Sequence, residues 1–180
     1  WYEASVQLAL GKLLRLGDLA FDVGANLGVI AAMMGAAVGP YGRVVGFEAS
    51  PRAIAQLHAN LNYSNAFNVT VLHRAVADRS DDLVPVFYGD ASPADTIMPV
   101  EGREPDARIE TIALDDYVER LGAAPRVVKM DIEGAELLAL QGFERTLAAH
   151  SPALVLEAVS NDLRIGEMLQ AFGYNLCIDA

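Results

Sequence analysis

The stretch FDVGANLG, residues Phe21–Gly28, decides the fold predicted for this chain. It continues an apolar run over Leu19–Val23, which is typical of a buried strand, and it leads into small apolar residues over Leu27–Val38, which favour a helix. A glycine-containing turn from a buried strand into a helix is where an open α/β sheet binds its ligand. We therefore expect a ligand site at the carboxyl end of this strand, although an ordinary tight turn would also need glycine.

Short apolar runs alternate with amphipathic stretches along the chain, which is typical of βαβ units. Further strands are predicted at Arg43–Phe47, Phe67–Leu72, Arg126–Met130, Ala153–Leu156 and Tyr174–Ile178. Further helices are predicted at Tyr2–Leu16, from an N-cap at Ser50 and Pro51 to Asn62, at Glu133–Leu147 and at Leu163–Phe172. Right-handed crossovers turn this order into an α/β fold with a doubly wound, mostly parallel, Rossmann-like sheet. We expect a single domain over residues 1–180, with residues 1–16 forming an N-terminal helix.

The least regular part of the sequence is residues 78–110, which we expect to form an irregular insert containing strands. Leu83–Tyr88 is a predicted strand in which Pro85 indicates a sheet edge or a separate hairpin. Ile109–Ala113 is expected to pair with this strand before a short helix begins near Asp115.

Composition limits the classes of partner. The formal net charge is -11 and the pI is about 4.5, so we expect no concentrated basic face that would bind nucleic acid. The longest apolar run, Val29–Val38, is about half of the ~20 residues that a membrane-spanning helix needs. A lone cysteine, Cys177, can form neither an internal disulfide nor a CxxC metal site, and we expect a cytoplasmic location.

The loop after the first strand departs from the fingerprint of dinucleotide-binding proteins, whose glycines would fall at Gly24, Asn26 and Val29. Asn26 would hinder the approach of a pyrophosphate, and the negative charge of Asp22 would repel it. Both features disfavour a nicotinamide-dependent oxidoreductase and favour S-adenosylmethionine, which carries an ammonium and a sulfonium group. The cofactor-binding residues predicted in this loop are Asp22, Gly24, Ala25, Asn26 and Gly28.

Two later segments complete the predicted cofactor site. Glu48 ends the second strand, about 20 residues beyond the glycine loop, where an acidic residue accepts hydrogen bonds from ribose hydroxyls, and Ala49 follows it. The adenine is expected near His73–Val76, which includes Ala75, with Asp78 accepting from its exocyclic amine. Asp78 would equally serve to cap a local turn.

A second group of candidates lies in VVKMDIEGAE, residues Val127–Glu136. Asp131 falls at the carboxyl end of a strand, and Lys129 shares its face if the strand is regular. A lysine in such an apolar strand needs a partner, for which Glu133 and Glu157 are candidates. We predict Asp131, Lys129 and Glu133 as catalytic residues and assign no metal, while a Mg²⁺ ion shared by Asp131 and Glu157 stays open as an alternative.

These motifs together resemble the FkbM family of S-adenosylmethionine-dependent methyltransferases. The blocks occur in order between about Leu16 and Gly173: FDVGANLG, VVGFEASP (Val44–Pro51), ALDDYV (Ala113–Val118), VVKMDIEGAE and LVLEAV (Leu154–Val159). The resemblance implies a class I methyltransferase fold and O-methylation of a small molecule such as a sugar or a polyketide. It also implies that Asp131 faces the reacting centre and that Asp22, Gly24, Asn26, Gly28 and Glu48 bind the cofactor.

The chain departs from the family pattern in two places. It ends after one predicted strand beyond its last helix, whereas the fold normally closes with a further antiparallel strand. That sheet edge either lacks its last strand or is completed by another chain, which would allow a homo-oligomer. Family members also often carry a polar residue where this chain has Ala158.

We expect Asp131 to act as a general base on the acceptor hydroxyl. The acceptor pocket is expected between Leu83–Arg108 and the N-terminal helix, with Tyr88, Met98 and Tyr2 as candidate lining residues. A non-catalytic cofactor-binding or scaffold domain of a larger protein is the alternative from a different functional class.

Overall fold

The computed structural model describes residues 3–89, 95–157 and 163–175. The predicted features at Tyr2, Ala158 and Cys177, and most of the predicted strand Tyr174–Ile178, lie outside the described residues.

A parallel sheet forms the centre of the molecule. Its strands lie in the order β3-β2-β1-β7-β8, and every neighbouring pair is parallel. Their bounds are β1 Leu19–Val23, β2 Arg43–Glu48, β3 Val69–His73, β7 Val127–Met130 and β8 Ala153–Leu156. The order confirms the predicted doubly wound α/β fold, because the chain builds outward from β1 to β3 and then crosses to the other side of β1. The carboxyl ends of β1 and β7 therefore meet at the point where the strand order reverses, which is the place for ligands in this architecture.

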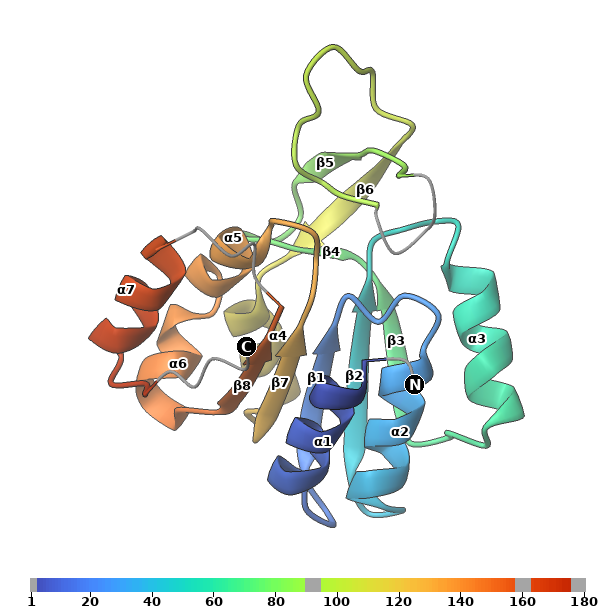
Figure 1. Cartoon of the computed structure of the whole chain (residues 1–180), viewed down its shortest axis with the longest axis vertical. Helices are drawn as coiled ribbons and strands as arrows, with labels where there is room; N and C mark the ends of the chain where they lie inside the picture. The colour runs from blue at the N-terminus through green and yellow to red at the C-terminus, as the bar shows by residue number, and fades with distance from the viewer. Residues whose placement is uncertain (1–2, 90–94, 158–162, 176–180) are drawn as a thin grey trace.

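Helices cover both faces of the sheet. Figure 1 shows α1 and α2 on the near face, α4 on the far face, α3 beside α2, and α5–α7 at the β8 side. Their bounds are α1 Ala4–Leu13, α2 Val29–Val38, α3 Ile54–Tyr63, α4 Leu114–Leu121, α5 Glu136–Gln141, α6 Glu144–His150 and α7 Leu163–Ala171. Among the described residues, no helix has the length and apolar content needed to cross a membrane.

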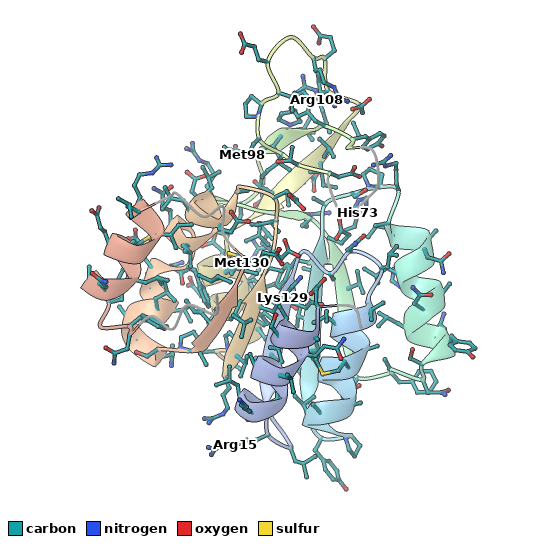
Figure 2. All side chains as sticks on the ribbon, viewed as in Figure 1. Arg15, His73, Met98, Arg108, Lys129 and Met130 are labelled. Carbon is teal, nitrogen blue, oxygen red and sulfur yellow. The ribbon has the colours of Figure 1, made fainter. Side chains whose placement is uncertain are left out.

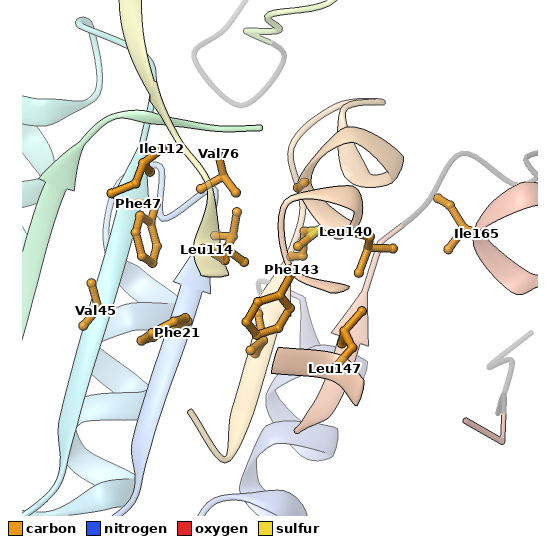
Figure 3. Packing of buried hydrophobic residues seen from close by; sticks show 14 of the residues in the cluster. Phe21, Val45, Phe47, Val76, Ile112, Leu114, Leu140, Phe143, Leu147 and Ile165 are labelled. Atoms are coloured by element: carbon orange, nitrogen blue, oxygen red, sulfur yellow. The ribbon is translucent and has the colours of Figure 1, made fainter. Parts of the chain in front are cut away.

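Alternate residues of the strands fill two cores. Phe21 of β1 and Phe47 of β2 point to the α4–α7 side, where their rings meet edge to face with centroids 5.4 Å apart and pack among Leu140 and Phe143 (Figure 3). On the other face, the main apolar cluster is Leu10, Leu14, Ala20, Ile30, Met34, Val38, Val44 and Val127. Burial on both faces explains why the central strands are continuous apolar runs in the sequence.

The insert forms a small sheet of its own, ordered β4-β6-β5. Its strands are β4 Ala75–Val76, β5 Leu83–Val86 and β6 Ala107–Ile112, and β5 pairs antiparallel with β6. The edge position expected for Pro85 is confirmed, because β5 is the outer strand. Figure 1 shows this sheet standing above the carboxyl ends of the central strands.

Two helix predictions need correction. The helix predicted for Glu133–Leu147 is split into α5 and α6. At the break, the carbonyl oxygen of Gly142 accepts a hydrogen bond from the amide of Asp115 at 2.8 Å. A Cβ at Gly142 would lie 2.1 Å from the carbonyl oxygen of Ala77. The buried Asp115 carboxylate then accepts hydrogen bonds from the amides of Arg145 and Thr146 at 2.8 and 2.9 Å, which starts α6.

The second correction concerns the start of α3. Ser50 was expected to be its N-cap, but a turn follows Ser50 and the helix begins at Ile54. The hydroxyl of Ser50 accepts from the amide of Arg52 at 3.3 Å within this turn and donates to Asp95 at 2.5 Å, a contact with the insert that local sequence does not reveal.

Candidate functional site

A cavity of about 510 Å³ opens at the carboxyl ends of the central strands. Its lining includes most of the residues predicted for the site: Gly24, Ala25, Asn26, Glu48, Ala49, Ala75, Lys129, Asp131 and Glu133. Asp22, Gly28 and Asp78 are not among the lining residues. Further lining residues were not predicted individually, and they include Glu3, Ser50, Arg74, Asp95, Thr96 and Ile97. Arg74 lies in the segment expected near the adenine, and Asp95, Thr96 and Ile97 lie in Leu83–Arg108, the segment expected at the acceptor pocket.

The loop after β1 is held close to the ends of β2 and β7. The amides of Gly24 and Ala25 donate to the carbonyl of Phe47 at 2.9 and 3.0 Å. Gly24 has φ 78°, and a Cβ there would lie 1.8 Å from the carbonyl oxygen of Asp131. Only glycine allows the two strand ends to come this close.

Gly28 and Asp78 make contacts away from the cavity. A Cβ at Gly28 would lie 3.2 Å from the Leu57 side chain, so Gly28 brings α2 close to α3. The Asp78 carboxylate accepts from Arg79 at 3.1 Å, and the Asp78 backbone borders the α5–α6 break at Gly142. Neither residue enters our proposal for direct cofactor contact.

Glu48 lies at the rim of the loop and is 7% exposed. Its Oε2 accepts from the amide of Asn26, and its Oε1 accepts from the amide of Ser50, each at 2.6 Å. Burial raises the pKa of Glu48, while the two amides act in the opposite direction. Each carboxylate oxygen keeps a further lone pair, so Glu48 can accept a ligand hydroxyl without giving up its backbone partners.

Lys129 lies between two carboxylates on the α1–α2 face of the sheet. The register of β1 and β7 sets Asp22 opposite Lys129, and the ammonium lies 3.5 Å from Asp22 Oδ1 and 3.6 Å from Asp131 Oδ2. It also donates to the carbonyl of Gly24 at 3.1 Å. Figure 2 shows Lys129 near the middle of the molecule, below the insert. Asp22 and Asp131 thus take the role for which the sequence suggested Glu133 or Glu157.

Asp22 is fully buried, and its burial raises its pKa from 3.8 to about 6, with Lys129 acting in the opposite direction. Asp22 therefore lies beneath the cavity and acts on its wall through Lys129. A direct contact with a ligand is not supported by this position.

This shift gives a prediction for stability against pH. The folded state binds the Asp22 proton more tightly than the unfolded chain does, so its contribution to stability is full below pH 3.8 and is lost as the pH rises through about 6. Asp22→Asn should reduce the fall in unfolding free energy between about pH 4 and 6, measured by urea unfolding followed by circular dichroism.

Part of that slope should remain in Asp22→Asn, because the pKa values of Glu48, Glu133 and Glu157 are raised as well. Asp82→Asn, at an exposed position, is the control for loss of one negative charge. Identical pH profiles for the wild type and Asp22→Asn would contradict the prediction.

The loop after β7 has an unusual backbone. Glu133 has φ 52°, and the buried Glu136 folds back so that its Oε1 accepts from the amides of Ile132 and Gly134 at 3.1 and 3.2 Å. Burial is the main cause that raises the pKa of Glu133, followed by the charge of Asp131. The sequence showed Glu136 only as a carboxylate in the first turn of a helix, because its partners depend on the loop conformation.

Negative charge accumulates around Asp131. Its charge is the main cause that raises the pKa of Glu157, which follows β8 and lines the same cavity. Within residues 3–89, 95–157 and 163–175, no group of three or more His, Cys, Asp or Glu side chains is arranged to hold a metal ion. The Mg²⁺ alternative at Asp131 and Glu157 thus has no third protein ligand among these residues.

Part of the segments predicted to form the acceptor pocket lies at this cavity. Ile97 and Val86 of the insert line the cavity, and so does Glu3, just before α1. Tyr88 and Met98 are not lining residues, and Tyr88 instead lies under the Arg52 guanidinium, 4.2 Å from the ring centroid.

A family model described as the methyltransferase FkbM domain matches residues 22–176. A search of curated proteins gave no match.

Solved structures with the same fold are numerous. A methyltransferase FkbM from Methylobacillus flagellatus superposes with a TM-score of 0.64 at 25% identity, over 88% of this chain and 39% of that chain. The present chain therefore spans well under half of that protein. A precorrin-6y C5,15-methyltransferase from Geobacter metallireducens superposes with a TM-score of 0.63 at 19% identity, over 97% of this chain and 74% of that chain.

A third structure, fibrillarin from Aeropyrum pernix with natively bound S-adenosylmethionine, has a TM-score of 0.56 at 14% identity, over 94% of this chain and 64% of that chain. At these low identities, the precorrin and fibrillarin enzymes support the fold alone.

Proposed function

Because the chain belongs to the methyltransferase FkbM domain family, whose cofactor is S-adenosylmethionine, we propose that it transfers a methyl group from this cofactor to a hydroxyl group of a small molecule, such as a sugar or a polyketide. The observation that carries the proposal is that one cavity is bordered both by the Gly24 loop with Glu48 and by Asp131. A binding group and a candidate base thus share one space.

The residues around the cavity fit this cofactor. A volume of about 510 Å³ falls in the range of small-molecule sites, roughly 300–1,000 Å³. Glu48 offers carboxylate oxygens for the ribose hydroxyls, the backbone of Gly24–Asn26 and Ala49 borders the same rim, and Ala75 lies where we place the adenine. The acidic groups around Asp131 suit a cofactor with cationic groups and disfavour a pyrophosphate.

We assign the chemistry to three side chains. When bound, the cofactor supplies an electrophilic methyl group on its sulfonium. An alcohol with a pKa near ~15.7 is not deprotonated in advance by a carboxylate near ~3.9, so Asp131 accepts the hydroxyl proton as the new bond forms. Lys129 orients Asp131 through their ion pair, and Glu133 lies on the acceptor side of the same loop.

The partners follow from the same proposal. A net charge of -11 argues against nucleic acid, and we place the domain in the cytoplasm with a small-molecule acceptor as its partner. Pairing of two copies through the β8 side of the sheet would give a homo-oligomer.

Removing the Glu48 carboxylate is the direct test of cofactor binding. We expect the wild-type chain to bind S-adenosylhomocysteine with micromolar affinity in a calorimetric titration. Glu48→Ala should weaken binding roughly 10- to 100-fold, because it removes hydrogen bonds to a charged group. Glu104→Ala, at an exposed position, is the matched control, and NADH should not bind. Unchanged affinity in Glu48→Ala would contradict the assigned role.

Transfer of a radiolabelled methyl group to a panel of sugars and polyketide alcohols then tests the reaction itself. Cofactor binding without transfer to any acceptor would favour a non-catalytic domain. Full activity in excess EDTA would exclude the Mg²⁺ alternative.

A further inference from the structure

The insert reaches back over the cavity through a short segment, Asp95–Ile97. All three residues line the cavity, although they are far in sequence from β1, β2 and β7. An isolated bridge between Thr96 and Phe87 holds the segment to the end of β5. In Figure 2 the neighbouring Met98 lies above Lys129, between the insert and the carboxyl ends of the central strands.

Asp95 attaches this segment to the loop after β2. Its side chain is 4% exposed and forms an ion pair with Arg52, whose Nε lies 3.2 Å from Oδ2. The same Oδ2 accepts from the Ser50 hydroxyl at 2.5 Å, and Oδ1 accepts from the amide of Gly89 at 3.0 Å. A buried carboxylate with this many donors is held firmly in place.

The contact with Ser50 continues to the proposed ribose-binding group. The amide of Ser50 donates to Glu48 Oε1 at 2.6 Å while its hydroxyl donates to Asp95. Ser50 therefore links the Asp95 carboxylate to the Glu48 carboxylate through one residue. A change at Asp95 would disturb the alignment of Glu48 even though the two side chains do not touch.

The next residue attaches the segment to the opposite wall. The hydroxyl of Thr96 donates to the carbonyl of Glu133 at 3.0 Å and accepts from the amide of Met98 at 3.0 Å. Asp95 and Thr96 together join the loop that follows Glu48 to the loop that follows Asp131. The segment thus bridges the proposed cofactor side and the proposed acceptor side of the cavity.

We propose that Asp95 is a positioning residue that holds this bridge closed over the cofactor and sets the rate at which the cofactor product leaves. The inference rests on the proposed function, because it assumes that the cofactor lies beneath the bridge. Closing segments of this kind often control product release. Most mutations that change the affinity of one binding site act on the dissociation rate.

The test is the dissociation rate of S-adenosylhomocysteine from the whole chain, measured by stopped-flow or surface plasmon resonance. Asp95→Ala should raise the dissociation rate constant roughly 10- to 100-fold and leave the association rate constant nearly unchanged. Asp95→Asn, which keeps the shape and is expected to fold, should give a smaller increase, because its oxygen still accepts from Ser50.

Asp106→Ala is the matched control. Asp106 lies in the same insert and accepts from the amide of Tyr88 at 2.8 Å and from Arg103 at 2.9 Å, but it does not line the cavity. It should lower the melting temperature without changing the dissociation rate, which separates positioning from general stability.

The possible failures are distinguishable. No binding to the wild-type chain would overturn the proposed function. Wild-type binding together with an unchanged dissociation rate in Asp95→Asn and Asp95→Ala would overturn the role of Asp95 alone. An equal increase in Asp106→Ala would also overturn it, since any loosening of the insert would then suffice.

Discussion

Gly24→Ala is expected to abolish S-adenosylhomocysteine binding and to destabilise the fold by roughly 2 to 5 kcal/mol. An alanine Cβ at this position would lie 1.8 Å from the carbonyl oxygen of Asp131 and 3.0 Å from the Ile132 side chain. The loop after β1 would have to move away from β7, and the hydrogen bond from Lys129 to the Gly24 carbonyl would be disturbed with it. Calorimetric titration and urea unfolding measure the two effects separately.

Gly17→Ala is the matched control for this variant. Gly17 has φ 88°, close to the 78° of Gly24, but a Cβ there would meet nothing within 4 Å. Its substitution should cost only the backbone strain of about 1–2 kcal/mol and should leave binding unchanged. If Gly24→Ala binds as tightly as Gly17→Ala, the close approach of the two strand ends is not required for the site.

The central sheet could be predicted from the sequence because its strands are buried on both faces. Leu19–Val23 and Ala153–Leu156 were predicted with the bounds that the structure shows, since each is an apolar run between turn residues, interrupted only by Asp22 in the first. The helix break at Gly142 could not be predicted, because it depends on contacts with Ala77 and Asp115 from distant parts of the chain. The start of α3 was misplaced because the Ser50 hydroxyl, which accepts from the amide of Arg52 at 3.3 Å, precedes a turn over residues 51–53, and the helix begins only at Ile54.

The site could be predicted in part for a related reason. Parallel strands bring their carboxyl ends to one edge, so Gly24, Glu48 and Asp131 could be placed together from strand order alone. The partner of Lys129 could not be identified, because it depends on the register that sets Asp22 opposite Lys129. Asp95 and Thr96 lie within the segment predicted for the acceptor pocket, but they could not be singled out because only the folded insert brings them to the cavity.

The Asp22–Lys129–Asp131 group connects the buried Asp22, beneath the cavity, to the candidate base Asp131 at the cavity wall. Lys129 is 4% exposed and has carboxylates 3.5 and 3.6 Å away on either side. Removing one partner of a buried ion pair leaves an uncompensated charge, which is strongly unfavourable. Asp22 therefore balances the charge of the buried Lys129, and Lys129 in turn holds the Asp131 carboxylate at the wall of the cavity.

Asp131→Asn should lower the turnover of methyl transfer roughly 10²- to 10⁴-fold, the range for loss of a general base, while changing S-adenosylhomocysteine affinity less than about tenfold. Asparagine keeps the size of the side chain but cannot accept the hydroxyl proton. The measurement pairs single-turnover transfer of a radiolabelled methyl group with calorimetric titration, so that loss of chemistry is separated from loss of binding.

Glu157→Gln is the matched control for Asp131→Asn, since Glu157 lines the same cavity and its substitution also removes one negative charge. If Asp131 acts as the base, Glu157→Gln should retain most of the turnover. If both variants lose turnover equally, the summed negative charge of the cavity would be the feature that matters, acting on the cationic transition state. Unchanged turnover in Asp131→Asn would remove this residue from the mechanism and direct attention to Glu133, which lies in the same loop and also faces the cavity.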